Sequence, residues 1–165
     1  MFTQRTATHM PLDYTDYAIL QQLQDHAKLT NVQLAQRIDL SPAATLERVK
    51  KLERQGVIKS YHAKLDREQL ALHTCILMQI KLRYLAKQDI DALRTCIAHI
   101  PEIVTCYQVV GNADFLIKVI TTDMAAYQHV VHQLSKVEGI QHMQAFVVAA
   151  SLKDTGVPVL PPRNI

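Results

Sequence analysis

Four basic side chains are concentrated in the stretch LSPAATLERVKKLERQGVI, which runs from Leu40 to Ile58. From Arg48 to Arg67 the chain carries seven bases and only two acids, although the net charge of the whole chain is only +3. Bases gathered in one short stretch have the chemistry to bind the phosphate groups of a nucleic acid. An ordinary solvated helix can carry the same charges, so the surrounding elements have to decide between these two interpretations.

The basic stretch has the start and stop signals of a helix. Ser41 is a good N-cap, Pro42 suits the first helical position, and Gly56 suits the end of the helix. Upstream, residues 30–33 read TNVQ, the pattern of a capping box that opens a shorter helix. Residues 16–26 have the apolar spacing of a supporting helix. A supporting helix followed by two helices that are joined by a tight turn is the pattern of a helix-turn-helix.

At about 100° per residue, the predicted helix after Ser41 has two different faces. Thr45, Val49 and Leu52 share one side and predict the face that packs on the other helices. The opposite side would face the major groove of DNA. It carries Ala43, Glu47, Lys50 and Arg54, with Lys51 nearby.

The side chains on the groove-facing side differ in the contacts that they could make. Lysine and arginine suit phosphates or base edges, and the helix start suits a phosphate. Glu47 could accept from a cytosine amino group, while Ala43 and Ala44 would leave room for a thymine methyl group. Arg48 falls beside the packing face, so we expect it to brace the helix by holding a phosphate or pairing with an acid. The candidate DNA-binding residues are Ser41, Ala43, Ala44, Glu47, Arg48, Lys50, Lys51 and Arg54.

The remaining elements predict an α+β chain with a second domain. Val57–Ile58 and Tyr61–Ala63 are expected to form short strands of a wing, and Asp66–Gln69 a capped helical turn. Downstream, alternating and helical patterns predict strand 76–84, helix 88–100, strand 102–110, turn 111–114, strand 115–121, helix 123–136 and strand 140–151. This βαββαβ order is ferredoxin-like, with helices on one face of an antiparallel sheet. A second copy of the chain could cover the other face, which predicts a homodimer.

The turn Gly111-Asn112-Ala113-Asp114 is a candidate ligand loop. Glycine permits a tight turn and close approach of a ligand to the backbone. The Asp114 carboxylate could accept from the ammonium group of an amino acid. The alternative is a plain hairpin turn in which Asp114 accepts from its own backbone.

From about Leu12 to Leu160 the chain resembles the Lrp/AsnC family of bacterial and archaeal transcription regulators. Four segments carry the resemblance. The first is Leu12-Asp13 followed by Asp16, and the others are LSPAATLERVKKLERQGVIKSYHAKLD, CYQVVGNADFLIKV and EGIQHMQAFVVAASLK. The resemblance implies a winged helix-turn-helix in residues 12–66 and a ligand-sensing and oligomerisation domain in 75–153. A linker in 67–74 is expected between them, and the proline-rich end predicts an extended tail in 154–165. The resemblance also implies small effectors, usually amino acids, and dimers that often assemble into octamers.

Four positions depart from the family pattern around the sensing loop. Asn112 stands where the loop usually has aspartate. Val110, Met143 and Ala145 stand where threonine is frequent. The resemblance therefore implies a sensing pocket that is more apolar than usual, or a ligand that differs from leucine.

Composition and motifs narrow the function further. No apolar run is long enough to cross a bilayer, and MFTQRTATHMP has no apolar signal core, so we expect a cytoplasmic, nucleoid-associated protein. No glycine-rich phosphate loop, Ser/His/Asp arrangement or catalytic carboxylate pair is evident, so we expect neither an enzyme nor a cofactor. His129 and His132 have a spacing that could ligate a metal, but a solvated helix surface is the favoured interpretation.

Two rival functions remain open at this point. A sirohaem-decarboxylase-like enzyme subunit shares the two-part architecture, with His62, His73 or His99 as candidate contacts to a tetrapyrrole. An architectural DNA-binding protein would bind DNA without sensing an effector. We favour a DNA-binding transcriptional regulator that is modulated by a small effector.

Overall fold

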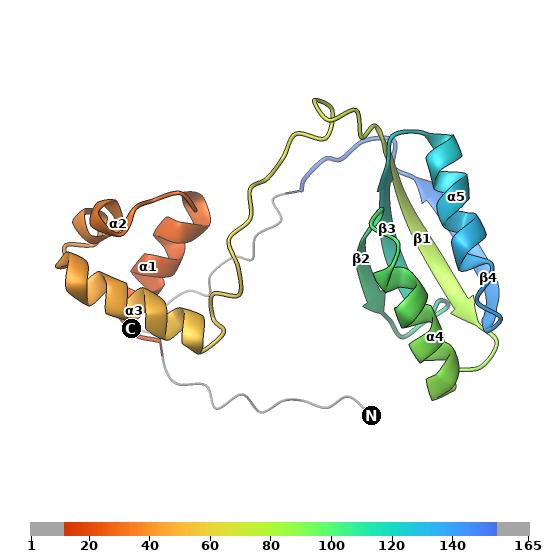
Figure 1. Cartoon of the computed structure of the whole chain (residues 1–165), viewed down its shortest axis with the longest axis horizontal. Coiled ribbons are helices and arrows are strands. Elements are labelled where there is room, and N and C mark those ends of the chain that lie inside the picture. The colour runs from red at the N-terminus through yellow and green to blue at the C-terminus, as the bar shows by residue number, and fades with distance from the viewer. Residues whose placement is uncertain (1–11, 155–165) are drawn as a thin grey trace. The chain divides into compact units, whose positions relative to one another are not determined.

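The computed structural model describes residues 12–154, which divide into two compact units. The first unit ends at Lys64, and the second runs from Leu65 to Asp154. Figure 1 shows three helices in the first unit, and a sheet with two helices in the second.

Capping side chains define the starts of the three helices in the first unit. The helices are α1 (Tyr14–Asp25), α2 (Asn31–Arg37) and α3 (Pro42–Arg54). The predicted capping box of α2 is confirmed, because Thr30 N donates to Gln33 Oε1 at 3.0 Å and Gln33 N donates to Thr30 Oγ1 at 3.2 Å. At α3, Ser41 Oγ accepts from Ala44 N at 3.2 Å, as predicted. Helix α1 starts two residues before the predicted position, because Asp13 caps it.

A small apolar core holds the three helices together. Ile19, Leu34 and Leu52 contribute one side chain from each helix, and all three are at most 2% exposed. The turn between α2 and α3 is tight, since Leu40 N donates to Ala35 O at 3.1 Å. These elements confirm the predicted helix-turn-helix.

The segment after α3 contains no strand between residues 55 and 73, so the two strands predicted for the wing are wrong. The backbone N–H groups of Val57 and Ile58 both donate to Leu52 O, at 3.0 and 3.2 Å, and so complete the end of α3. Their donors are therefore not free to pair with another strand, and residues 12–64 contain no strand that could pair with this segment. The predicted turn at Asp66 does form, because Asp66 Oδ1 accepts from Glu68 N at 2.9 Å.

The second unit has the predicted βαββαβ order. Its elements are β1 (Thr74–Leu82), α4 (Lys87–Ala98), β2 (Ile103–Gln108), β3 (Phe115–Thr121), α5 (Met124–Leu134) and β4 (Ile140–Val147). The strands lie in the order β2-β3-β1-β4, and all neighbours are antiparallel. This confirms the ferredoxin-like sheet, with β1 and β3 at its centre.

Helices α4 and α5 pack on one face of the sheet (Figure 1). Alternate residues of β1 and β3 point into this core, so that Ile76, Met78, Ile117 and Val119 are nearly inaccessible to solvent. The residues in between point to the other face of the sheet, which no element of the second unit covers. Its exposed apolar side chains are Leu77, Tyr107, Leu116 and Phe146. The one-sided arrangement inferred from the sequence is therefore present.

Candidate nucleic-acid interface and sensing loop

Helix α3 separates its side chains as the helical spacing predicted. Thr45 and Leu52 are fully buried and Val49 is half-buried, so these residues form the packing face. Six candidate DNA-binding residues are exposed, and two are half-buried. The exposed ones are Ser41, Ala43, Ala44, Glu47, Lys50 and Arg54, and the half-buried ones are Arg48 and Lys51.

Arg48 pairs with two carboxylates at the start of α1. Its Nη1 lies 2.6 Å from Asp13 Oδ2 and 2.9 Å from Asp16 Oδ1. Hydrogen bonds to these two carboxylates raise the pKa of Arg48, so its charge is fixed. The pairing gives Arg48 the bracing partners that the sequence predicted, and it ties α3 to the beginning of α1.

Asp16 is the buried centre of this ion-pair network. Its side chain is inaccessible to solvent, and its Oδ2 also lies 3.4 Å from Lys51 Nζ. A buried carboxylate is costly unless cations and hydrogen-bond donors surround it. Two bases from α3 supply that compensation, and therefore the amino end of α1 fixes the orientation of α3.

Asp13 belongs to the same network but lies at the surface. Its side chain is half-exposed, and its Oδ1 accepts from Asp16 N at 2.8 Å as the helix cap. Burial by itself would raise the pKa of Asp13, but the Asp16 N–H and the Arg48 guanidinium outweigh it and hold the pKa below its ordinary value. Asp13 is therefore a carboxylate at neutral pH.

The remaining bases of the α3 face are less constrained. Lys50 Nζ lies 3.6 Å from Glu47 Oε1 one turn earlier, and both side chains are largely exposed. Such an exposed pair contributes little to stability. Arg54 forms no ion pair with any residue that the structure describes. Lys50 and Arg54 are therefore the bases whose charges are most available to a ligand.

The amino end of α3 is anchored to α2. Asn31 Nδ2 donates to Pro42 O at 2.7 Å, and Thr45 Oγ1 donates to Ser41 O at 3.0 Å. The first turn of α3 thus has a fixed position relative to α2, while Ala43 and Ala44 present only small side chains to solvent. A rigid, uncrowded helix start is suited to close contact with a large polyanion.

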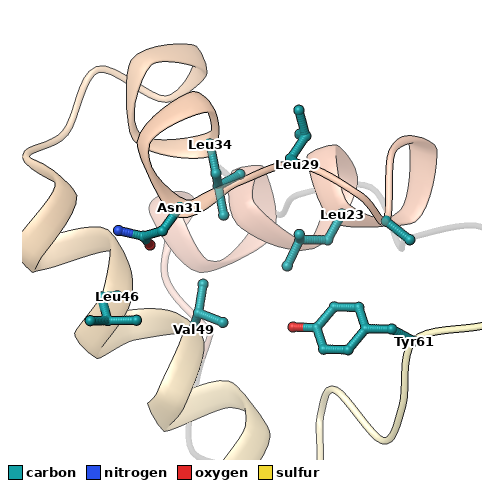
Figure 2. A pocket seen from close by; sticks show the side chains of 8 residues that line it. Leu23, Leu29, Asn31, Leu34, Leu46, Val49 and Tyr61 are labelled. Atoms are coloured by element: carbon teal, nitrogen blue, oxygen red, sulfur yellow. The ribbon is translucent and has the colours of Figure 1, made fainter.

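An apolar pocket of about 190 Å³ lies on the other side of α3 (Figure 2). It is lined by Leu23, Ala27, Leu29, Asn31, Leu34, Leu46, Val49 and Tyr61. Tyr61 lies at its edge, and its hydroxyl donates to Glu53 Oε1 at 3.0 Å. Burial, followed by this hydrogen bond, raises the pKa of Tyr61 to about 12. The hydrogen bond holds the segment after α3 against the helix.

The predicted sensing loop is a hairpin turn with an exposed and a buried half. Gly111 and Asn112 are exposed, whereas Ala113 and Asp114 are 7% and 5% exposed. Gly111 has a φ of 153°, a conformation that glycine adopts readily and other residues rarely do. The loop therefore offers only the backbone and side chains of its first half to solvent.

Asp114 has partners that neither sequence interpretation anticipated. Its Oδ2 accepts from Leu82 N at 2.8 Å, and its Oδ1 lies 3.1 Å from Lys81 Nζ. The interpretation in which Asp114 accepts from its own turn is wrong, because its side chain ties the hairpin to the end of β1 instead. A direct contact with an ammonium group would have to compete with Lys81.

The histidines considered for other chemistry are dispersed on exposed positions. His62, His73, His99, His129 and His132 are all exposed. Residues 12–154 contain no group of three or more histidine, cysteine or acidic side chains that could hold a metal ion. None of the helices that the structure describes is long and apolar enough to cross a membrane.

Sequence reasoning missed the pairing of Asp13 and Asp16 with the candidate interface helix α3. The structure places them against Arg48, which is more than 30 residues away in the chain. A capping signal was visible, since an aspartate occurs at the N-cap position and again three residues later. The long-range pairing was not visible, because no local pattern reports which faces of two helices meet.

Comparisons with known proteins cover both units. The family model for the Lrp/AsnC ligand binding domain matches residues 75–158, and one for a winged helix-turn-helix DNA-binding domain matches residues 12–59. The leucine-responsive regulatory protein of Escherichia coli K12 is 33% identical over 153 residues, which cover 92% of this chain and 93% of that protein. The leucine-responsive regulatory protein of Haemophilus influenzae is 36% identical over 151 residues, covering 90% of each.

A solved structure has the same fold over nearly its whole length. It is a transcriptional regulator from Neisseria meningitidis in complex with L-methionine, with a TM-score of 0.83 and 35% sequence identity. The alignment covers 90% of this chain and 97% of that one. The similarity thus extends over the helical unit and the sheet unit together.

Proposed function

Since the chain belongs to the Lrp/AsnC family of DNA-binding transcriptional regulators, we propose that the exposed face of α3 is the surface that enters the major groove. The observation that carries this proposal is the distribution of small and basic side chains along α3. Its exposed face combines two alanines near the start with Lys50 and Arg54 farther along. The exposed large apolar side chain of α3, Leu46, lines the pocket beside Val49.

The proposal assigns different roles to the bases of α3. Lys50 and Arg54 contact DNA directly, while Ser41 and the helix start receive a phosphate. Arg48 and Lys51 hold α3 in place through the α1 carboxylates, and Glu47 sets the position of Lys50 or accepts from a base. The DNA-binding domain comprises residues 12–66, and the sensing domain residues 75–153.

A mobility-shift experiment on the DNA upstream of the protein's own gene tests this proposal. We expect specific binding that weakens steeply between about 50 and 200 mM salt, because phosphate contacts release counterions. Binding that is absent at both salt concentrations would refute the proposal. Binding without salt dependence would refute the assignment of the basic face.

We further propose that the second unit senses an amino acid. Support comes from its match to a ligand-binding domain, from relatives named as leucine-responsive, and from the methionine complex of the Neisseria regulator. In this proposal the exposed backbone of Gly111 and Asn112 approaches the effector, and Asp114 contributes by holding Lys81. Thermal-shift measurements against the twenty amino acids test the idea, since a sensor should be stabilised by at least one of them. No shift with any of them would leave the architectural alternative.

Self-association completes the proposed function. The open sheet face carries exposed apolar side chains that a second copy of the chain would cover, and a dimer would present two α3 helices to successive half-sites. Assembly of dimers into octamers, as in the family, would multiply these contacts. The proposed place of action is the nucleoid in the cytoplasm, and no catalytic step is needed.

A further inference from the structure

The ion pairs between α1 and α3 lie within the proposed DNA interface. Both half-buried bases of α3 are engaged by carboxylates of α1, Arg48 by Asp13 and Asp16, and Lys51 by Asp16. Their charges are therefore compensated within the protein before any DNA arrives. This face therefore offers less positive charge to a ligand than the number of its bases suggests.

The two carboxylates differ in how easily they can be displaced. Asp16 is completely buried, so its removal from Arg48 and Lys51 would leave an uncompensated charge in the interior. Asp13 is 50% exposed and Arg48 is 32% exposed, so their contact is accessible from solvent. A phosphate oxygen can compete for the same guanidinium N–H that donates to Asp13, because both anions bind arginine in the same geometry.

We propose that Asp13 acts as an internal competitor of the DNA phosphates for Arg48 and thereby limits the non-specific affinity of the protein for DNA. In the free protein Asp13 occupies the exposed side of the guanidinium. A phosphate that contacts Arg48 must displace this carboxylate and also approach its negative charge. This inference rests on the proposed orientation of α3, since Arg48 has to lie near the DNA backbone.

The Asp13→Asn variant isolates the charge of this carboxylate. Asparagine caps helices about as well as aspartate, so the hydrogen bond that Asp16 N donates at the start of α1 can persist. Asp25→Asn is the matched control, because Asp25 ends the same helix, is exposed and interacts with Gln21 rather than with α3. Both variants change the net charge of the chain equally.

The measurement is the affinity of the full-length protein for a fluorescent 40-base-pair duplex of scrambled sequence, in several salt concentrations. One additional phosphate contact steepens the logarithmic salt dependence by about 0.9, which corresponds to roughly eightfold tighter binding at 0.1 M salt. We expect Asp13→Asn to approach this gain and Asp25→Asn to stay within about twofold of the unmodified protein.

A double-mutant cycle shows whether the effect passes through Arg48. In an Arg48→Gln background, Asp13→Asn should no longer tighten binding. The proposal is overturned if Asp13→Asn matches Asp25→Asn, or if it tightens binding equally with and without Arg48. If circular dichroism shows that Asp13→Asn is unfolded, Asp13→Ser replaces it, since serine also caps helices.

The experiment distinguishes this inference from the function on which it rests. If the unmodified protein does not bind the duplex even at the lowest salt concentration, the proposed DNA interface fails and the role of Asp13 fails with it. If the unmodified protein binds and the two asparagine variants behave alike, only the role of Asp13 fails.

Discussion

The basic side chains of α3 fall into two groups, those that pair with carboxylates of α1 and those that are exposed to solvent without such a partner. The helical spacing of the sequence predicted which residues are buried and which are exposed, because that spacing is a local property. It could not predict the carboxylates that meet Arg48, nor that Asp114 would engage Lys81 and Leu82, because those contacts depend on how elements distant in the chain pack together. The sequence therefore predicted which residues of the candidate site are exposed, but not the ion pairs and hydrogen bonds that link them to other elements.

Replacing both available bases of α3 tests the contact surface at residue level. Lys50→Ala combined with Arg54→Ala should weaken DNA binding by at least about tenfold at 0.1 M salt, because two phosphate or base contacts are lost. Fluorescence anisotropy measures the affinity, and circular dichroism checks that the fold is kept. The control is Lys87→Ala with Lys136→Ala, two exposed lysines of the second unit. Equal affinity in both double variants would contradict the assignment.

Asp114 should be a stability residue whatever its role toward an effector. Asp114→Ala leaves the N–H of Leu82 without its acceptor in a buried position, which should cost about 1–3 kcal/mol in the free energy of unfolding. Asp114→Asn should cost less, since an amide oxygen can still accept from that N–H. Urea denaturation measures both values. An alanine variant as stable as the unmodified protein would show that the hydrogen bond between Asp114 and Leu82 of β1 does not contribute to stability.

At the scale of elements, the sequence predicted every helix and every strand of the second unit, since each has a clear periodicity and capping or turn signals. The prediction was wrong where strand-like residues follow α3. Val57 and Tyr61 have high strand propensity, but a strand needs a partner, and their side chains and backbone are used against α3 instead. Strand propensity alone therefore predicted the wrong secondary structure for the segment after α3.

The hydrogen bond between Tyr61 and Glu53 predicts a pH dependence of stability. The pKa of Tyr61 is raised from about 10 to about 12, so the stabilisation by its protonated hydroxyl is complete below pH 10 and is lost as the pH rises through about 12. Because Tyr61 is half-exposed, we expect the contribution to stay below about 1 kcal/mol. Urea denaturation of the protein and of Tyr61→Phe should show a stability difference that is constant up to pH 10 and then shrinks. A difference that grows above pH 10 would contradict this assignment.

The contact between the start of α4 and the turn before β4 depends on a glycine. A Cβ atom at position 139 would lie 2.9 Å from Asp89 Cβ and 3.0 Å from Asp89 Cγ, and the Gly139 carbonyl also accepts from Arg83 N at 2.8 Å. Gly139→Ala should therefore lower the free energy of unfolding by about 1–3 kcal/mol, as overpacking generally does. Thermal denaturation followed by circular dichroism measures the change. An unchanged melting temperature would show that the backbone yields without cost.

At the scale of the whole molecule, the one-sided sheet makes self-association the main expectation. Leu77 of β1 and Phe146 of β4 are paired neighbours and remain 47% and 44% exposed on the open face. Leu77→Glu should place a charge in the interface between two copies and shift the protein to monomers. Light scattering coupled to gel filtration measures the mass. Leu152→Glu, at a residue outside the sheet that is 98% exposed, is the control and should leave the mass unchanged.

The strand order β2-β3-β1-β4 also has a consequence for the synthesis of the chain. Strand β1 is made first, but its neighbours in the finished sheet are β3 and β4, and the Ile76–Val147 pair joins residues about 70 positions apart. On the ribosome, β1 therefore waits with two unpaired edges and an apolar face while the helical unit ahead of it can already fold from contacts of its own. Unpaired strand edges and exposed apolar surface favour aggregation, so we expect a nascent chain at this stage to aggregate more readily than the folded protein.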